Sequence, residues 1–213
     1  MKFTLTYDGE LRSNGDPGQK WEIRKHLAPQ LEELWRIATP LCELRKNPYF
    51  SIVPGTVWME IHHSAEHLYP SPQDETNADP SRFINLIEPI RRGSRSFFPL
   101  VRDSLALKCF LKITFLRREE PGRVYQGGDL DNRLKTLFDA LAAPNVDQLV
   151  ADATVDDPIY CLLEDDALIC GFSIETHRLL ARPNASRHDV HLVIEVDTRV
   201  TLPRSYNHRF LGD

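Results

Sequence analysis

The residues best suited to chemistry are two aspartates, Asp129 and Asp131, one residue apart in the stretch GGDLDNRLKTLFDAL. In an extended segment, side chains two residues apart point to the same side, so both carboxylates can approach one cation. Lys135 follows Asp131 by four residues, and the later stretch LEDDALI offers Asp165 or Asp166 as a third carboxylate. Carboxylate oxygens suit Mg²⁺, which activates water against a phosphodiester. The pattern therefore indicates metal-assisted phosphodiester hydrolysis, with Lys135 orienting a ligand carboxylate or neutralising charge on the phosphate.

The same acids also have a purely structural interpretation. Aspartate is favoured at the start of a helix, because its carboxylate accepts hydrogen bonds from backbone N–H groups and interacts with the helix dipole, which is worth about 1 kcal/mol. Asp139 is expected to pair with Lys135 one helical turn back, or to act as a fourth acid. Spacing alone leaves capping and metal binding both open.

Charge is distributed unevenly along a chain of 213 residues with a net charge of −5. Residues 82–128 contain ten Lys or Arg and four acids, which gives +6, whereas residues 129–166 contain ten acids and two basic residues, which gives −8. A basic segment that leads into an acidic one suits a metal site that receives a polyanion. Two ordinary solvated surfaces would give the same counts.

Hydrophobic periodicity predicts the elements that must position these residues. Alternating apolar residues predict strands over 2–8, 105–116, 168–174 and 189–199, and a 3.6-residue period predicts a helix over 129–141. Asp16 and Pro17 are placed to start another helix, which Pro29 is expected to kink or divide. A short helix is expected within 81–93. The fold class is α/β or α+β, with a mixed β-sheet flanked by helices.

Length and composition indicate one domain over residues 1–213. Its core is expected at about 1–37 and 105–200, with 38–104 as an elaboration or insertion. No apolar run reaches the roughly 18–20 residues that span a bilayer, and the first residues lack the apolar stretch of a signal peptide. The four cysteines show no CxxC spacing, so they are expected to be reduced thiols in a cytoplasmic protein with no membrane partner.

The stretch GGDLDNRLKTLFDAL, between the strand LKCFLKITF and the stretch LEDDALI, resembles the RusA-like Holliday-junction resolvases. The match extends residue by residue over two groups of positions. These positions are Asp129, Asp131, Asn132, Lys135, Asp139, Ala140 and Leu141, and then Asp165, Asp166 and Ile169. The good resemblance covers about a third of the chain, mainly 105–176. The connection 142–163 is longer than in that family, and 38–104 has no obvious counterpart there.

The resemblance implies a homodimeric endonuclease that depends on Mg²⁺, with Mn²⁺ able to substitute, and that nicks branched or duplex DNA during recombination and repair. On its pattern Asp129, Asp131 and Asp166 bind the metal, with Asp165 as the alternate, and Lys135 is the catalytic lysine. The residues expected to bind DNA phosphates are Arg117, Arg118, Arg123 and Arg133. Two other functions stay open: a non-catalytic nucleic-acid-binding or assembly protein that retains the fold, and a phosphohydrolase of small nucleotides.

Overall fold

The computed structural model describes residues 1–51, 83–118, 129–150, 158–180, 186, 188–204 and 206–211. The strands within these ranges are β1 (Lys2–Glu10), β2 (Tyr49–Ser51), β3 (Phe83–Asn85), β4 (Ile90–Arg92), β5 (Arg95–Val101), β6 (Leu107–Arg117), β7 (Ile159–Leu163), β8 (Ile169–Arg178) and β9 (Asp189–Val200). The α-helices are α1 (Pro17–Ile37), α2 (Thr39–Lys46) and α3 (Asp129–Leu141).

The largest sheet has four strands in the order β1–β9–β6–β8. β9 pairs antiparallel with both β1 and β6, whereas β8 pairs parallel with β6. The alternating apolar residues of the two long inner strands are at most 1% exposed: Leu107, Cys109, Leu111, Ile113 and Phe115 in β6, and Val190, Leu192, Ile194 and Val196 in β9. The period-2 pattern therefore predicted the buried face of this sheet correctly.

A second sheet has the order β4–β5–β7, and β2 pairs with β3 alone. β5 is antiparallel to β4 but parallel to β7, so this sheet is also mixed. The fold is therefore α+β, with two mixed sheets flanked by helices. Phe97, Leu100 and Val101 of β5 are fully buried, so part of the interval 38–104 belongs to the hydrophobic core.

Helix α1 begins as its sequence predicts. The Asp16 carboxylate accepts a hydrogen bond from the backbone N–H of Gln19 at 2.8 Å, and Pro17 occupies the first turn, where its missing N–H is not needed. Of the two expected effects of Pro29, division of the helix is wrong, because α1 continues through it, and a kink stays a prediction. Its apolar face is buried on both sides of the proline, which stabilises the helix across the missing hydrogen bond.

None of the described helices is both long and apolar enough to cross a membrane.

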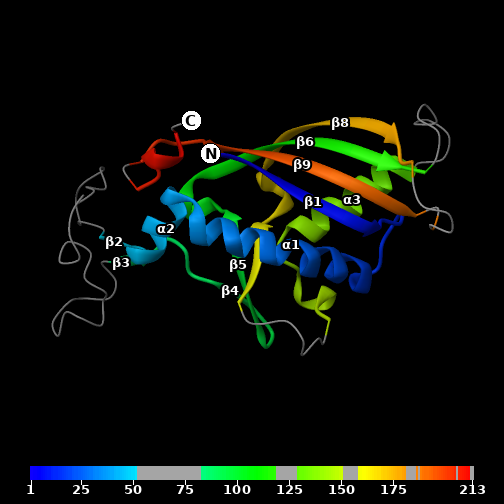
Figure 1. Cartoon of the computed structure of the whole chain (residues 1–213). Helices are drawn as coiled ribbons and strands as arrows, with labels where there is room; N and C mark the ends of the chain where they lie inside the picture. The colour runs from blue at the N-terminus through cyan, green and yellow to red at the C-terminus, as the bar shows by residue number, and fades with distance from the viewer. Residues whose placement is uncertain are drawn as a thin grey trace.

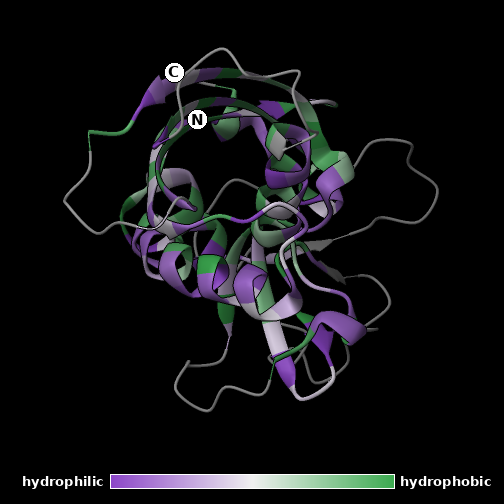
Figure 2. Ribbon diagram, turned by 90° about the vertical axis from the view of Figure 1, so that its right-hand side faces the viewer, coloured by the Kyte–Doolittle hydropathy of each residue, from purple (hydrophilic) through white to green (hydrophobic). Residues whose placement is uncertain are grey.

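Figure 1 shows α1 and α3 side by side on one face of the four-stranded sheet. The two chain ends lie near each other, at the end of that sheet where β1 begins. The helices in Figure 2 carry both hydrophilic and hydrophobic stretches, as expected for helices with one side on a core. The helix expected within 81–93 is wrong: β3 and β4 occupy this interval, and β4 forms a hairpin with β5. A short apolar run does not distinguish a helix from a strand, so the secondary structure of this interval depends on its pairing with distant segments.

Buried Arg24 connects α1 to the end of α3. Its Nε donates to the carbonyl oxygen of Ala142 at 3.0 Å, and its Nη2 donates to that of Asp139 at 2.5 Å. The last carbonyls of a helix have no partner within the helix and carry partial negative charge, so a cation stabilises them. Burial lowers the pKa of Arg24 to about 10 from its ordinary value, which still leaves the side chain charged at neutral pH.

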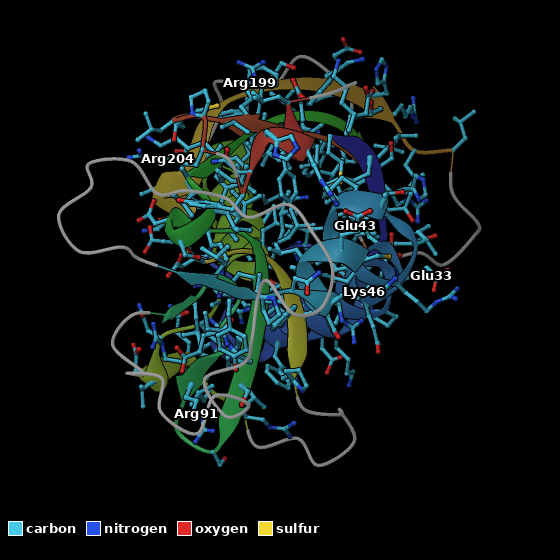
Figure 3. The ribbon with its side chains drawn as sticks, turned by 90° about the vertical axis from the view of Figure 1, so that its left-hand side faces the viewer. Glu33, Glu43, Lys46, Arg91, Arg199 and Arg204 are labelled. Atoms are coloured by element: carbon cyan, nitrogen blue, oxygen red, sulfur yellow. The ribbon has the colours of Figure 1, made fainter. Side chains whose placement is uncertain are left out.

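We predict that Arg24→Met lowers the free energy of unfolding by about 3 kcal/mol, because it keeps most of the side-chain volume but leaves two buried carbonyls without their charged donor. Chemical denaturation measures the loss. The matched control is Arg36→Met on the same helix, whose guanidinium pairs with Glu33 in solvent; Glu33 points away from the ribbon in Figure 3. The control should be nearly neutral, and equal losses in both variants would contradict the role given to Arg24.

Candidate active site

The two acidic motifs lie in the crossover between the parallel strands β6 and β8, which passes through α3 and then through β7 of the second sheet. β6 ends at Arg117, α3 begins at Asp129, and the acidic pair Asp165–Asp166 leads into β8, which lies parallel to β6. Figure 1 shows α3 running back along these two strands. The helix therefore begins near their carboxyl ends and finishes near their amino ends, where β8 starts.

One side of α3 is buried and the other carries the candidate catalytic residues. Its buried residues are Leu130, Arg133, Leu134, Thr136, Leu137, Ala140 and Leu141. Asp131 and Lys135 are exposed and lie one helical turn apart, so they share one surface. Asp129 is the first residue of α3, but its side chain lies outside the described part of the chain, as does Gly128 before it. The expected capping of this helix therefore stays a prediction.

The four arginines expected to bind phosphate have different positions. Arg117 and Arg133 are each 2% exposed, so their guanidinium groups lie beneath the surface in this conformation. Burial gives no support to their predicted contact with DNA. Arg118 is half-buried just after β6, and Arg123 lies outside the described residues. Arg118 is therefore the one of the four that the structure describes with partial access to solvent.

Asp139 forms its ion pair with Lys20 of α1, not with Lys135 as the sequence suggested. The Lys20 Nζ lies 2.7 Å from Oδ2 of Asp139, and the two side chains are only 14% and 20% exposed. One turn nearer the start of α3, the hydroxyl of Thr136 accepts a hydrogen bond from the backbone N–H of Gly15 at 2.9 Å. A side chain at position 15 would collide with Thr136, because an added Cβ would lie 2.6 Å from its Cγ2. The turn before α1 therefore packs directly on α3.

The acids before β8 differ in their contacts. Glu164 Oε2 accepts a hydrogen bond from the backbone N–H of Asp103 at 3.0 Å, and Asp165 Oδ1 accepts one from that of Ala167 at 2.9 Å. Asp165 thereby caps the short 3-10 helix that begins at Asp166. Glu164 and Asp165 thus have structural roles, which favours Asp166 as the acid available for chemistry.

The surroundings of Asp166 oppose its negative charge. Partial burial raises the pKa of its carboxyl above the ordinary value, and the nearby carboxylates of Asp165 and Asp139 raise it further. A carboxyl group in such surroundings would be stabilised by a cation. The electrostatics of this end of α3 are therefore suited to a bound positive charge.

The structure does not bring all the predicted metal ligands together within one chain. Asp166 interacts with Asp139 at the end of α3, whereas Asp131 lies eight residues earlier, about 12 Å along the helix axis at 1.5 Å per residue. Within the described ranges, no three acidic, histidine or cysteine residues form a group that could hold a metal ion. The donor chemistry suits Mg²⁺, and the side chain of Asp129, the third predicted ligand, lies outside the described residues.

The chain matches no protein-family model, no curated protein and no solved structure. The case for a function therefore depends on the residues themselves, their positions, and the resemblance described above.

Sequence reasoning missed the α1 residues that hold the candidate site in place. Lys20 and Arg24 lie four residues apart, and both contact Asp139 of α3, one through its carboxylate and the other through its backbone carbonyl. The sequence could have identified Arg24, because it lies within the apolar stripe of the helix, between Trp21 and Leu27, at a position expected to be buried. A buried arginine requires acceptors, and helix ends supply them.

We predict that Asp166→Asn makes the metal-free protein more stable to heat at neutral pH. The pKa of Asp166 is higher in the folded chain than its ordinary value of 3.8, so its charged form is disfavoured by folding. This destabilisation is present above the folded pKa and disappears as the pH falls below the unfolded value. The amide should therefore raise the melting temperature at about pH 7 but have little effect at about pH 3.

The matched control is Asp8→Asn in β1, whose carboxyl side chain is 78% exposed. It should leave the melting temperature unchanged at both pH values. A lower melting temperature for Asp166→Asn at neutral pH would show that Asp166 contributes to stability and would contradict the assignment.

Proposed function

We propose that this protein is a structure-specific DNA endonuclease of the RusA-like type, which resolves branched DNA such as Holliday junctions by metal-assisted phosphodiester hydrolysis. The observation that carries the proposal is the placement of both acidic motifs in the crossover between the parallel strands β6 and β8. One motif begins α3, and the other follows β7 and leads into β8. This is the order in which the resemblance places the catalytic carboxylates.

The side chains of α3 support the same conclusion. The exposed side chains of Asp131 and Lys135 place a carboxylate and an ammonium group on one surface. There the lysine could approach a phosphate held beside the carboxylate. On this proposal Asp129, Asp131 and Asp166 are the metal ligands, and Lys135 is the catalytic lysine. Mg²⁺ is the proposed cofactor and Mn²⁺ its substitute, because carboxylates are hard oxygen donors.

Branched or duplex DNA is the proposed substrate, because the basic segment 82–128 precedes the acids of α3. A symmetric homodimer would present two identical sites to a four-way junction, which is itself nearly two-fold symmetric. The four cysteines are free thiols, as expected for a cytoplasmic protein.

Cleavage of a synthetic four-way junction in Mg²⁺ tests the proposal. The wild type should nick the junction symmetrically, and Asp131→Asn and Asp166→Asn should each lower the rate by a factor of about 100 or more, because each removes a charge from the catalytic group. Asp8→Asn is the matched control and should cleave at the wild-type rate. Cleavage by Asp131→Asn at the wild-type rate would remove Asp131 from the mechanism.

The separation of Asp131 from Asp166 along α3 favours one alternative, a nucleic-acid-binding or assembly protein that retains the fold without the reaction. That protein would bind the junction equally well with and without Mg²⁺ and would nick no branched substrate. A gel-shift experiment in Mg²⁺ and in EDTA, run beside the cleavage reaction, distinguishes the two functions.

A further inference from the structure

We propose that the tip of the β4–β5 hairpin is a second nucleic-acid contact of this protein, where Arg91 and Arg92 bind the phosphates of a DNA arm at a distance from the candidate cleavage site. The hairpin lies in the interval 38–104, which has no obvious counterpart in the resolvase resemblance. The inference rests on the proposed function for the kind of nucleic acid. The contact itself is argued from the hairpin's own residues.

The hairpin is rich in arginine. Residues 89–102 contain four arginines and no aspartate or glutamate. Three of the arginines, Arg91, Arg92 and Arg95, lie at the tip, on both sides of a two-residue turn in which Gly93 has a φ of 56°. Guanidinium groups bind phosphate oxygens through paired N–H donors, so the chemistry of this tip suits a phosphate backbone.

Two of these arginines face each other across the hairpin. Arg92 pairs directly with Arg95 in the register of β4 and β5. Like charges directly opposite each other in an antiparallel pair lower the stability of the sheet. A bound anion would remove this repulsion, so the arrangement favours an anionic ligand.

Arg91 and Arg92 have no acidic partner among the described residues. Arg91 is exposed and Arg92 is half-buried, and one Nη of Arg92 donates to the carbonyl oxygen of Arg91 at 3.2 Å. Glu88 before β4 and Asp147 in the neighbouring 3-10 helix are exposed, but neither forms an ion pair with these two arginines. Residues 151–157, which contain three further acids, lie outside the described part of the chain. Within that part, the two guanidinium groups therefore stay available to an external anion.

Several contacts hold the hairpin in place. β5 pairs parallel with β7. The buried guanidinium of Arg102 donates to the carbonyl oxygens of Leu86 and Glu88, just before β4, at 3.3 and 2.7 Å. Arg95 lies over the ring of Trp21 of α1, 5.7 Å from its centroid. The tip is therefore preorganised, which lowers the entropy cost of binding.

The tip lies well away from the acids before β8. Figure 3 shows Arg91 at the opposite end of the molecule from Arg199 of β9. At the other end of β5, the backbone N–H of Glu164 donates to the carbonyl oxygen of Val101 at 2.9 Å. Arg95 precedes Val101 by six residues, about 20 Å along a strand at about 3.3 Å per residue. Phosphates of one DNA strand follow each other every 3.4 Å or so along the duplex, so the tip would contact a phosphate about six nucleotides from the cleaved one.

Binding of a four-way junction in EDTA, with arms longer than one helical turn, tests the contact. Arg91→Gln/Arg92→Gln should bind more weakly than the wild type. The slope of log affinity against log salt concentration should decrease in magnitude by about 2, since each lost phosphate contact removes about 0.9. The loss should be the same for junctions of different sequence, because phosphates carry no sequence information.

The matched control is Arg45→Gln/Lys46→Gln, which makes the same change in net charge at two exposed residues of α2. Lys46 and Arg91 lie apart in Figure 3. The control should bind the junction as the wild type does. Equal affinity and salt slope in Arg91→Gln/Arg92→Gln and the wild type, or the same loss in the control, would overturn the contact.

Melting temperatures without DNA show whether the variants fold. Removal of Arg92 relieves its repulsion with Arg95, so Arg91→Gln/Arg92→Gln should melt at or slightly above the wild-type temperature. Arg91→Gln alone changes only an exposed side chain and should lower the salt slope by about 1, which tests the contact even if the double variant unfolds.

Cleavage at saturating protein in Mg²⁺ separates this inference from the proposed function. Arg91→Gln/Arg92→Gln should then cleave at the wild-type rate, because the tip contributes to binding and does not touch the cleaved phosphate. A lower rate at saturation would contradict the position given to the tip. A protein that binds through the hairpin but nicks no junction would contradict the proposed function and support the contact.

Discussion

One buried guanidinium determines where α3 lies, and the candidate site depends on it. Arg24 of α1 donates to the carbonyls of Asp139 and Ala142 at the end of α3, and Lys20, one turn earlier, pairs with the Asp139 carboxylate. Burying a cation is unfavourable unless acceptors surround it, so the two helices are restricted to the arrangement that supplies them. Together with the buried apolar residues of α3 and the Gly15–Thr136 hydrogen bond, this contact determines that Asp131 and Lys135 face solvent.

The direction of α3 separates charges that the sequence brings close together. The helix returns along β6 and β8, so its start lies near one end of these strands and Asp166 lies near the other. This separation limits repulsion between acids within one chain, although Asp139 and Asp165 still oppose the charge of Asp166. Clustered acids reduce the stability of a protein without its cation, a common feature of functional sites.

Several elements could be predicted from local sequence because their signals are local. The alternation Leu107, Cys109, Leu111 predicted β6, and the Asp16–Pro17 pair predicted the start of α1. The interval 81–93 could not be predicted in this way. Its short strands β3 and β4 depend on pairing with β2 and β5, and the parallel pairing of β5 with β7 joins residues such as Phe97 and Ile159 that are far apart in the chain.

The sequence by itself determined the helix 129–141, the strands around it, and residue types suited to a cation and a phosphate, because periodicity and side-chain chemistry act between neighbours in the chain. Only the tertiary structure decided that Lys20, and not Lys135, pairs with Asp139, and that Arg117 and Arg133 are buried. It also decided that Asp131 and Asp166 lie at different ends of α3. These outcomes depend on how distant segments pack, and no spacing along the chain specifies that packing.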